Sequence, residues 1–201
     1  MNLGSKGESL AGNNQDQHDR LKRLFEGISN LNKPVIAVIN GPCYGGGNGL
    51  AMVCDIRIAS HPGVTFNLSE VTIGVAPALI SKYLVREWGA AKAREAMLTA
   101  RAIPAAELLT VGGVHHVAED AAAAHAYADA LVARFVGNAP GAMAAVKQLT
   151  NTMATEAEGE QDAAIARMFL DMMRPSLEAK YGIDMFRAKQ KADWSSLYAR
   201  Q

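Results

Sequence analysis

A run of three glycines between two apolar segments is the feature that most constrains how this chain folds. The stretch GPCYGGGNGLAMVCDIRIAS covers residues 41–60, and the three glycines are Gly45, Gly46 and Gly47. Glycine loses more backbone freedom on folding than any other residue. It is therefore placed where the chain needs an unusual φ angle or where another group must approach the backbone closely. The stretch predicts a tight connection with accessible backbone, and a fourth glycine follows at position 49.

The segments on either side of the glycines predict a strand before them and a helix after them. KPVIAVI, residues 33–39, is a short apolar run typical of a buried strand. LAMVC indicates a helix, and DIRIAS indicates the next strand. This order places free N–H groups at the start of a helix, where they can bind an anion or stabilise an oxyanion. A plain strand-to-helix turn explains the glycines equally well.

The remainder of the chain predicts an α/β core followed by a helical tail. DQHDRLKRLFEGISNL has helical spacing, VTFNLSEVTIG predicts a strand and a turn, and two helices separated by Gly89 come next. A short helix ended by Gly112 and Gly113 then leads into a strand. From residue 120 the chain becomes alanine-rich, with helices expected over 120–136, 141–155 and 158–173. We therefore expect a core over residues 1–119 and a tail over 120–201.

Charge and composition give no support for a nucleic-acid-binding, membrane or secreted protein. Lysine plus arginine equals aspartate plus glutamate at 20 each, so no electrostatic argument favours nucleic acid or an anionic membrane. The chain lacks a run of about 18 apolar residues and an apolar signal core. Cys43 and Cys54 are the two cysteines, which favours free thiols in a reducing compartment, with the cytoplasm expected.

The glycine stretch does not fit the familiar nucleotide or nucleophile motifs. No Lys-Ser or Lys-Thr follows it, the spacing is not G-x-G-x-x-G, and no G-x-S-x-G elbow is present. An oxyanion site without a local nucleophile is the interpretation that is left.

Four segments in order along the chain resemble the signature of the enoyl-CoA hydratase/isomerase (crotonase) superfamily. They are KPVIAVINGPCYGGGNGLAMVCDIRIAS, FNLSEVTIGVAPALISKYLVRE, LTARAIPAAELLTVGGVHHVAE and YGIDMFRAKQKADW, although Tyr181 in the last stands where an acidic residue is common. The resemblance implies an α/β spiral of β-β-α turns with a C-terminal helical trimerisation region. It also implies trimers or dimers of trimers, acyl-CoA thioester substrates, no metal, and no cofactor beyond the coenzyme A that the substrate carries.

The same resemblance assigns the chemistry to two residues. Gly46 is expected to be one of two backbone donors to the thioester carbonyl, whose oxygen gains charge as an enolate forms. Many hydratases carry two catalytic glutamates; position 49 is glycine here, while Glu70 matches the second. Glu70 is therefore expected to handle the proton alone. A surface carboxylate at a helix start is the alternative for an isolated glutamate.

The resemblance also implies contacts with the substrate. Within the glycine stretch and the segment after Glu70, these contacts are expected at Tyr44, Gly45, Gly47, Gly49 and Pro77. Phe186 and Lys189 match a Phe-x-x-Lys spacing that contacts the adenine and phosphates of coenzyme A, often in a neighbouring subunit. A solvated amphipathic last helix explains that pair equally well.

Glycine at position 49 and the segment SEVTIGVAPALISKYLVRE resemble the branch of methylglutaconyl-CoA and isohexenylglutaconyl-CoA hydratases. Our hypothesis is that Gly49 leaves room for a branched acyl group. Two other functions stay open: a double-bond isomerase, for which one glutamate suffices, and a non-catalytic acyl-CoA-binding subunit.

Other reactive residues favour structural roles. His115 and His116 lack a supporting cysteine or carboxylate cluster and are expected in a strand. Cys43 is expected to be a small buried side chain, and Asp55 a capping or buried structural residue. The family's other oxyanion donor lies just before the segment that MNLG matches. We therefore expect a further N-terminal segment, with its strands, in the natural protein; a truly short chain is the alternative.

Overall fold

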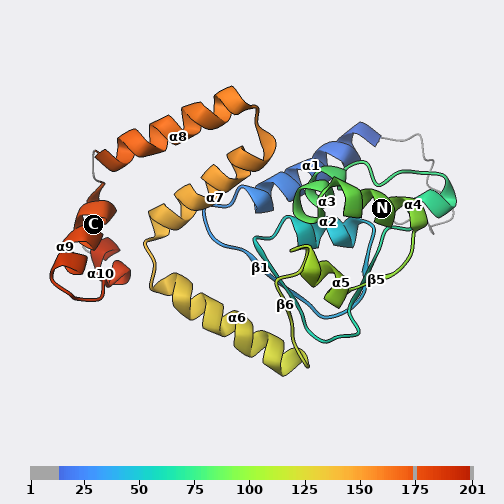
Figure 1. Ribbon diagram of the computed structural model, residues 1–201, viewed down its shortest axis with the longest axis horizontal. Coiled ribbons are helices and arrows are strands. Elements are labelled where there is room, and N and C mark those ends of the chain that lie inside the picture. The colour runs from blue at the N-terminus through green and yellow to red at the C-terminus, as the bar shows by residue number, and fades with distance from the viewer. Residues whose placement is uncertain (1–13, 174–175, 200–201) are drawn as a thin grey trace.

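The computed structural model describes residues 14–173 and 176–199, and it consists of an α/β core followed by a row of helices (Figure 1). The helices are α1 (Asn14–Ser29), α2 (Gly46–Met52), the 3-10 helix η1 (Glu70–Ile73), α3 (Ser81–Trp88), α4 (Ala90–Thr99), α5 (Ala105–Thr110), α6 (Ala121–Val136), α7 (Pro140–Thr155), α8 (Glu158–Met173), α9 (Leu177–Arg187) and α10 (Trp194–Tyr198). The strands are β1 (Ile36–Ile39), β2 (Cys43–Tyr44), β3 (Ile56–Ala59), β4 (Thr65–Asn67), β5 (Ile103–Pro104) and β6 (His116–Val117). In neither described range is a helix long and apolar enough to cross a membrane.

The strands form two small sheets. The first has the order β1-β3-β6 and is parallel throughout, with Ile36 opposite Ile56 and Ile58 opposite His116. The second has the order β2-β4-β5, in which β2 runs parallel and β5 antiparallel to β4. The expected α/β class is confirmed. The strand predicted over 33–39 begins three residues later, at Ile36, and the two-residue strands β2 and β5 were not predicted.

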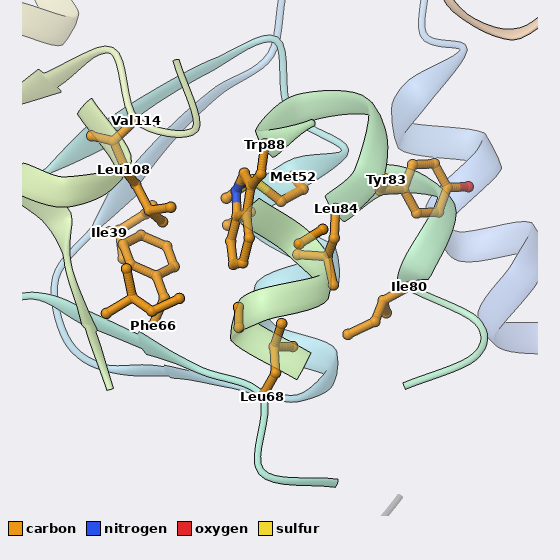
Figure 2. Packing of buried hydrophobic residues seen from close by; sticks show 14 of the residues in the cluster. Ile39, Met52, Phe66, Leu68, Ile80, Tyr83, Leu84, Trp88, Leu108 and Val114 are labelled. Atoms are coloured by element: carbon orange, nitrogen blue, oxygen red, sulfur yellow. The ribbon is translucent and has the colours of Figure 1, made fainter. Parts of the chain in front are cut away.

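The main hydrophobic core lies between the sheets and helices α1 to α5. Figure 2 shows Trp88 in the middle of this cluster, where its ring meets Phe66 edge-on with the ring centroids 6.4 Å apart. The Trp88 indole N–H donates to the sulfur of Met52 at 3.0 Å, so its one polar atom is paired. Gly89 separates α3 from α4 as expected, with a φ of 75°. This core fixes α2, α3 and β4 relative to one another.

Arginine 57, on β3, is a buried charge that ties the core together. Arg57 is 1% exposed. Its guanidinium donates to the carbonyls of Gly113 (2.8 Å) and Cys54 (2.6 Å) and to the carboxylate of Glu87 (2.7 Å). Burial lowers the pKa of Arg57, and the charge of Glu87 opposes that shift. One side chain thus joins β3, α3 and the turn that leads into β6.

We expect Arg57→Met to lower the free energy of unfolding by about 3–5 kcal/mol, because breaking a buried pair leaves its partners uncompensated. Arg101 is the matched control, since its guanidinium also pairs with glutamate side chains, those of Glu95 and Glu107, but is 39% exposed. Exposed pairs contribute little, so Arg101→Met is expected to cost much less than Arg57→Met. Urea unfolding of both variants measures the difference. Equal costs would mean that burial does not decide the contribution of Arg57.

The three helices predicted after residue 120 are confirmed as α6, α7 and α8. The Asp120 side chain accepts from the Ala123 N–H at 2.8 Å and caps α6, and proline 140 opens α7. In Figure 1 these helices lead away from the core, so that α9 and α10 lie at the opposite side of the molecule from α2 and α3.

Helix α7 is held to the core mainly by polar side chains. Lys147 is largely buried and pairs with Asp55 at 2.8 Å, while the same Asp55 oxygen accepts from the Val35 N–H at 2.7 Å. Asn151 donates to the Ser29 carbonyl at 3.3 Å. Asp55 therefore has the structural role that the sequence predicted. A cavity of about 560 Å³ lies beside this contact, between the first sheet and helices α6 and α7.

Candidate active site

The glycine run forms the turn between β2 and α2, and Gly45 is the residue that makes the turn possible. Its φ is 43° and its ψ is −116°, a conformation that side chains rarely adopt. A Cβ added at this position would also lie 3.1 Å from the Oε1 atom of Glu70. Gly45 is thus glycine for two reasons, the backbone angle and the approach of a carboxylate.

The next two glycines begin helix α2 and face open space. A Cβ at Gly46 or Gly47 would meet no other atom of the described chain within 4 Å. As the first residues of the helix, they have N–H groups with no acceptor inside it. Such groups can donate hydrogen bonds to a bound oxygen. Gly46 is exposed and Gly47 is partly exposed, so the accessible backbone that the sequence predicted is present at this turn.

Glu70 lies next to this turn, at the first position of η1, three residues after the end of β4. One carboxylate oxygen approaches Gly45, and the other, Oε2, is buried and has no hydrogen-bond partner within residues 14–173 and 176–199. Among the described residues no lysine or arginine forms an ion pair with Glu70. A carboxylate without an ion pair can act as a proton acceptor. The structure places Glu70 against Gly45, the residue that precedes Gly46.

Gly49 has a different role from the one that the sequence predicted. The hypothesis that this glycine leaves room for a branched acyl group is wrong, because side chains of the protein fill the space beside it. A Cβ at Gly49 would overlap the Ile80 Cγ2 methyl group and would lie 3.1 Å from Ile80 Cβ and 3.2 Å from Phe25 Cζ. Both side chains belong to the buried core, and Ile80 is labelled in Figure 2. Gly49 is therefore a packing residue. The sequence alone gives no sign of this, because Ile80 is distant along the chain.

The other predicted contact residues are spread over two regions. Tyr44 ends β2, immediately before Gly45, and is 62% exposed. Pro77 is partly buried in the loop between η1 and α3. Phe186 on α9 is 83% exposed, and Lys189 follows that helix with a φ of 54°. Because α9 lies across the molecule from α2, the pair does not reach Glu70 within one chain (Figure 1).

The remaining reactive side chains have structural partners. Burial raises the pKa of the Cys43 thiol to about 11, which is the opposite of what a thiolate nucleophile needs. His115 Nδ1 accepts from the Arg57 N–H at 3.1 Å, and the His116 ring stacks on Tyr127 with centroids 4.0 Å apart. His116 lies in β6 as expected, whereas His115 precedes the strand.

Asn48 is a site residue that the sequence analysis missed. It lies in the first turn of α2 and is fully buried. Its side-chain amide donates to the carbonyls of Cys43 and Asn67. The available signal was one amide residue between glycines in an otherwise apolar helix.

The chain is similar in sequence to known proteins along most of its length. Residues 3–197 match the model of the family described as Enoyl-CoA hydratase/isomerase. The enoyl-CoA hydratase AFT6-1 of Alternaria alternata is 40% identical over 185 residues, which are 92% of this chain and 61% of that protein. The chain thus spans about three fifths of that relative's length. A probable enoyl-CoA hydratase of Bacillus subtilis is 33% identical over 91% of this chain and 71% of its own.

A solved structure supports the fold independently. The crystal structure of an enoyl-CoA hydratase from Shewanella pealeana superposes with a TM-score of 0.80 at 31% identity, covering 90% of this chain and 67% of that one. The crotonase-like α/β fold expected from the sequence is therefore confirmed.

Proposed function

Because the chain belongs to the enoyl-CoA hydratase/isomerase family, we propose that the protein adds water across the α,β double bond of a branched, glutaconyl-type enoyl-CoA. The observation that carries this proposal is the placement of Glu70. Its carboxylate lies against the turn at Gly45, and one buried oxygen has no hydrogen-bond partner among the residues that the structure describes. That turn also carries Gly46, which is exposed, and Gly47, which is partly exposed, at the start of α2.

These groups perform hydration in two steps. The Gly46 N–H donates to the thioester carbonyl oxygen, while Glu70 takes a proton from water as the water oxygen bonds to C3. The electron pair of the double bond moves towards the carbonyl and forms an enolate, whose charge the Gly46 N–H stabilises. Glu70 then returns the proton to C2 on the same face, and the 3-hydroxyacyl-CoA results. Coenzyme A enters as part of the substrate, and the scheme uses no metal or separate cofactor.

The branched acyl class is supported by the resemblance of residues 69–87 together with glycine at position 49. It no longer rests on space beside Gly49, which Ile80 and Phe25 fill.

Two free thiols, Cys43 and Cys54, suit a reducing compartment such as the cytoplasm.

We also propose that the protein works as a homotrimer or a dimer of trimers. Helix α8 exposes the large apolar residues Ile165, Phe169 and Leu170, and contiguous exposed apolar groups are typical of an interface. Phe186 and Lys189 are distant from Glu70 in their own chain, so their contact with coenzyme A requires the site of a neighbouring subunit (Figure 1).

A double-bond isomerase is the second candidate, and the packing at Gly49 favours it. Since Ile80 fills that position, the site has one carboxylate where many hydratases have two. One carboxylate is enough to move a proton between two carbons of the acyl chain.

Product analysis in water enriched in ¹⁸O separates these functions. We expect the full-length protein to convert 3-methylglutaconyl-CoA faster than crotonyl-CoA and to incorporate one labelled oxygen into a 3-hydroxyacyl product. An unlabelled product with a shifted double bond would show that the protein is an isomerase and that the proposed hydration is wrong. Binding of both thioesters without turnover would identify a non-catalytic subunit.

A further inference from the structure

The buried amide of Asn48 joins three segments at one point. Its Nδ2 atom donates to the Cys43 carbonyl at 3.2 Å and to the Asn67 carbonyl at 2.8 Å, so both amide hydrogens are used. Asn48 is 0% exposed, and Cys43 and Asn67 belong to the paired strands β2 and β4. The side chain therefore connects these strands to the first turn of α2.

The Asn67 carbonyl holds both ends of the glycine turn. It accepts from the Gly45 N–H at 3.2 Å as well as from the Asn48 side chain. Tyr44 lies opposite Asn67 in the last pair of the parallel ladder, so regular strand pairing ends here. Beyond this point strands β2 and β4 diverge. The segment after β2 continues into Gly46, and the segment after β4 reaches Glu70 three residues later. The Asn48 amide and the Gly45 N–H are thus the bonds that connect them where the ladder stops.

We propose that Asn48 is a positioning residue that fixes the Gly46 N–H relative to the Glu70 carboxylate. This inference rests on the proposed function, since it assigns Asn48 a part in that same site. A backbone donor stabilises an oxyanion only at hydrogen-bond distance from the place where charge develops. A displacement of about 1 Å is enough to lower a rate by about 100-fold. Without the Asn48 amide, the Gly45 N–H is the one hydrogen bond in the described part of the chain that still ties the start of α2 to the Asn67 carbonyl of β4.

The test compares Asn48→Ala with Asn151→Ala in the full-length protein. Asn151 is the matched control because its side-chain amide also donates to a backbone carbonyl, that of Ser29, but on α7. Turnover of 3-methylglutaconyl-CoA gives kcat and KM. Binding of cinnamoyl-CoA gives a spectroscopic signature, because its absorption moves to longer wavelength when its carbonyl is polarised.

For Asn48→Ala we expect kcat to fall by about 10- to 100-fold. KM should change by less than about threefold, and cinnamoyl-CoA should bind with a reduced shift in absorption. Asn48→Ser keeps one donor and should recover part of both kcat and the shift; it also serves if the alanine variant fails to fold. Asn151→Ala should lower the melting temperature and leave kcat and the spectrum unchanged.

Two failures are distinguishable. If the wild-type protein turns over the thioester and folded Asn48→Ala matches its kcat and spectrum, Asn48 only stabilises the fold and the inference is wrong. If the wild-type protein neither turns over the thioester nor shifts the spectrum, the proposed function is wrong, and the inference is overturned with it.

Discussion

Glu70→Gln should lower kcat for hydration of 3-methylglutaconyl-CoA by about 10²- to 10⁴-fold, with little change in KM. Glutamine keeps the shape of the side chain that packs against Gly45 but cannot take a proton from water. A positioned general base contributes a factor of this size. Initial rates at saturating thioester measure the loss. Cinnamoyl-CoA should still show its spectral shift, because the Gly46 N–H is unchanged.

The matched control is Glu160→Gln, an exposed glutamate in the first turn of α8, outside the glycine turn and η1. It should keep wild-type kcat. A Glu70→Gln variant with more than about a tenth of the wild-type rate would contradict the role of Glu70 as the base. Position 49, where many hydratases carry a second glutamate, is glycine here and cannot replace it.

Gly49→Glu should lower the free energy of unfolding by about 3 kcal/mol or more. The new Cβ meets the Ile80 methyl group and Phe25, and overpacking of a core costs about 1–3 kcal/mol. A carboxylate buried among apolar side chains adds a further desolvation cost. Urea unfolding of the variant measures the sum.

Two further variants test the mechanism of that loss. Gly27→Glu is the matched control, since Gly27 also lies inside a helix, α1, but has nothing within 4 Å of an added Cβ. It should not lower the free energy of unfolding, because glutamate forms helix better than glycine. Gly49→Glu combined with Ile80→Ala should be less destabilised than the sum of the single changes by about 1–3 kcal/mol, because contacting residues are coupled. Strict additivity would show that Ile80 is not the obstacle.

The helices could be predicted because their determinants are local. The helices expected over 120–136 and 141–155 lie within one residue of α6 and α7. Asp120 caps α6 from the neighbouring residue and Pro140 opens α7, so local residues set where both helices begin. Strands β2 and β5 have two residues each and exist only because both pair with β4. Neither carries a periodic pattern long enough to detect.

The site could be predicted only in part, for a similar reason. Gly46 and Glu70 were found because their motifs resemble those of a known family. Gly49 was misinterpreted because its meaning depends on Ile80, which reaches it only through the tertiary fold. Asn48 was missed because its partners are carbonyl groups of two strands, and backbone atoms leave no trace in a sequence.

The contact between Gly49 and Ile80 also has an evolutionary consequence. Neither residue can change freely: a larger residue at 49 meets a filled core, and a smaller residue at 80 leaves a cavity that costs about 2–5 kcal/mol. Any route from this chain to one with glutamate at position 49 therefore passes through a less stable intermediate. Gly49 and Ile80 therefore depend on each other, and related chains should have both residues or neither.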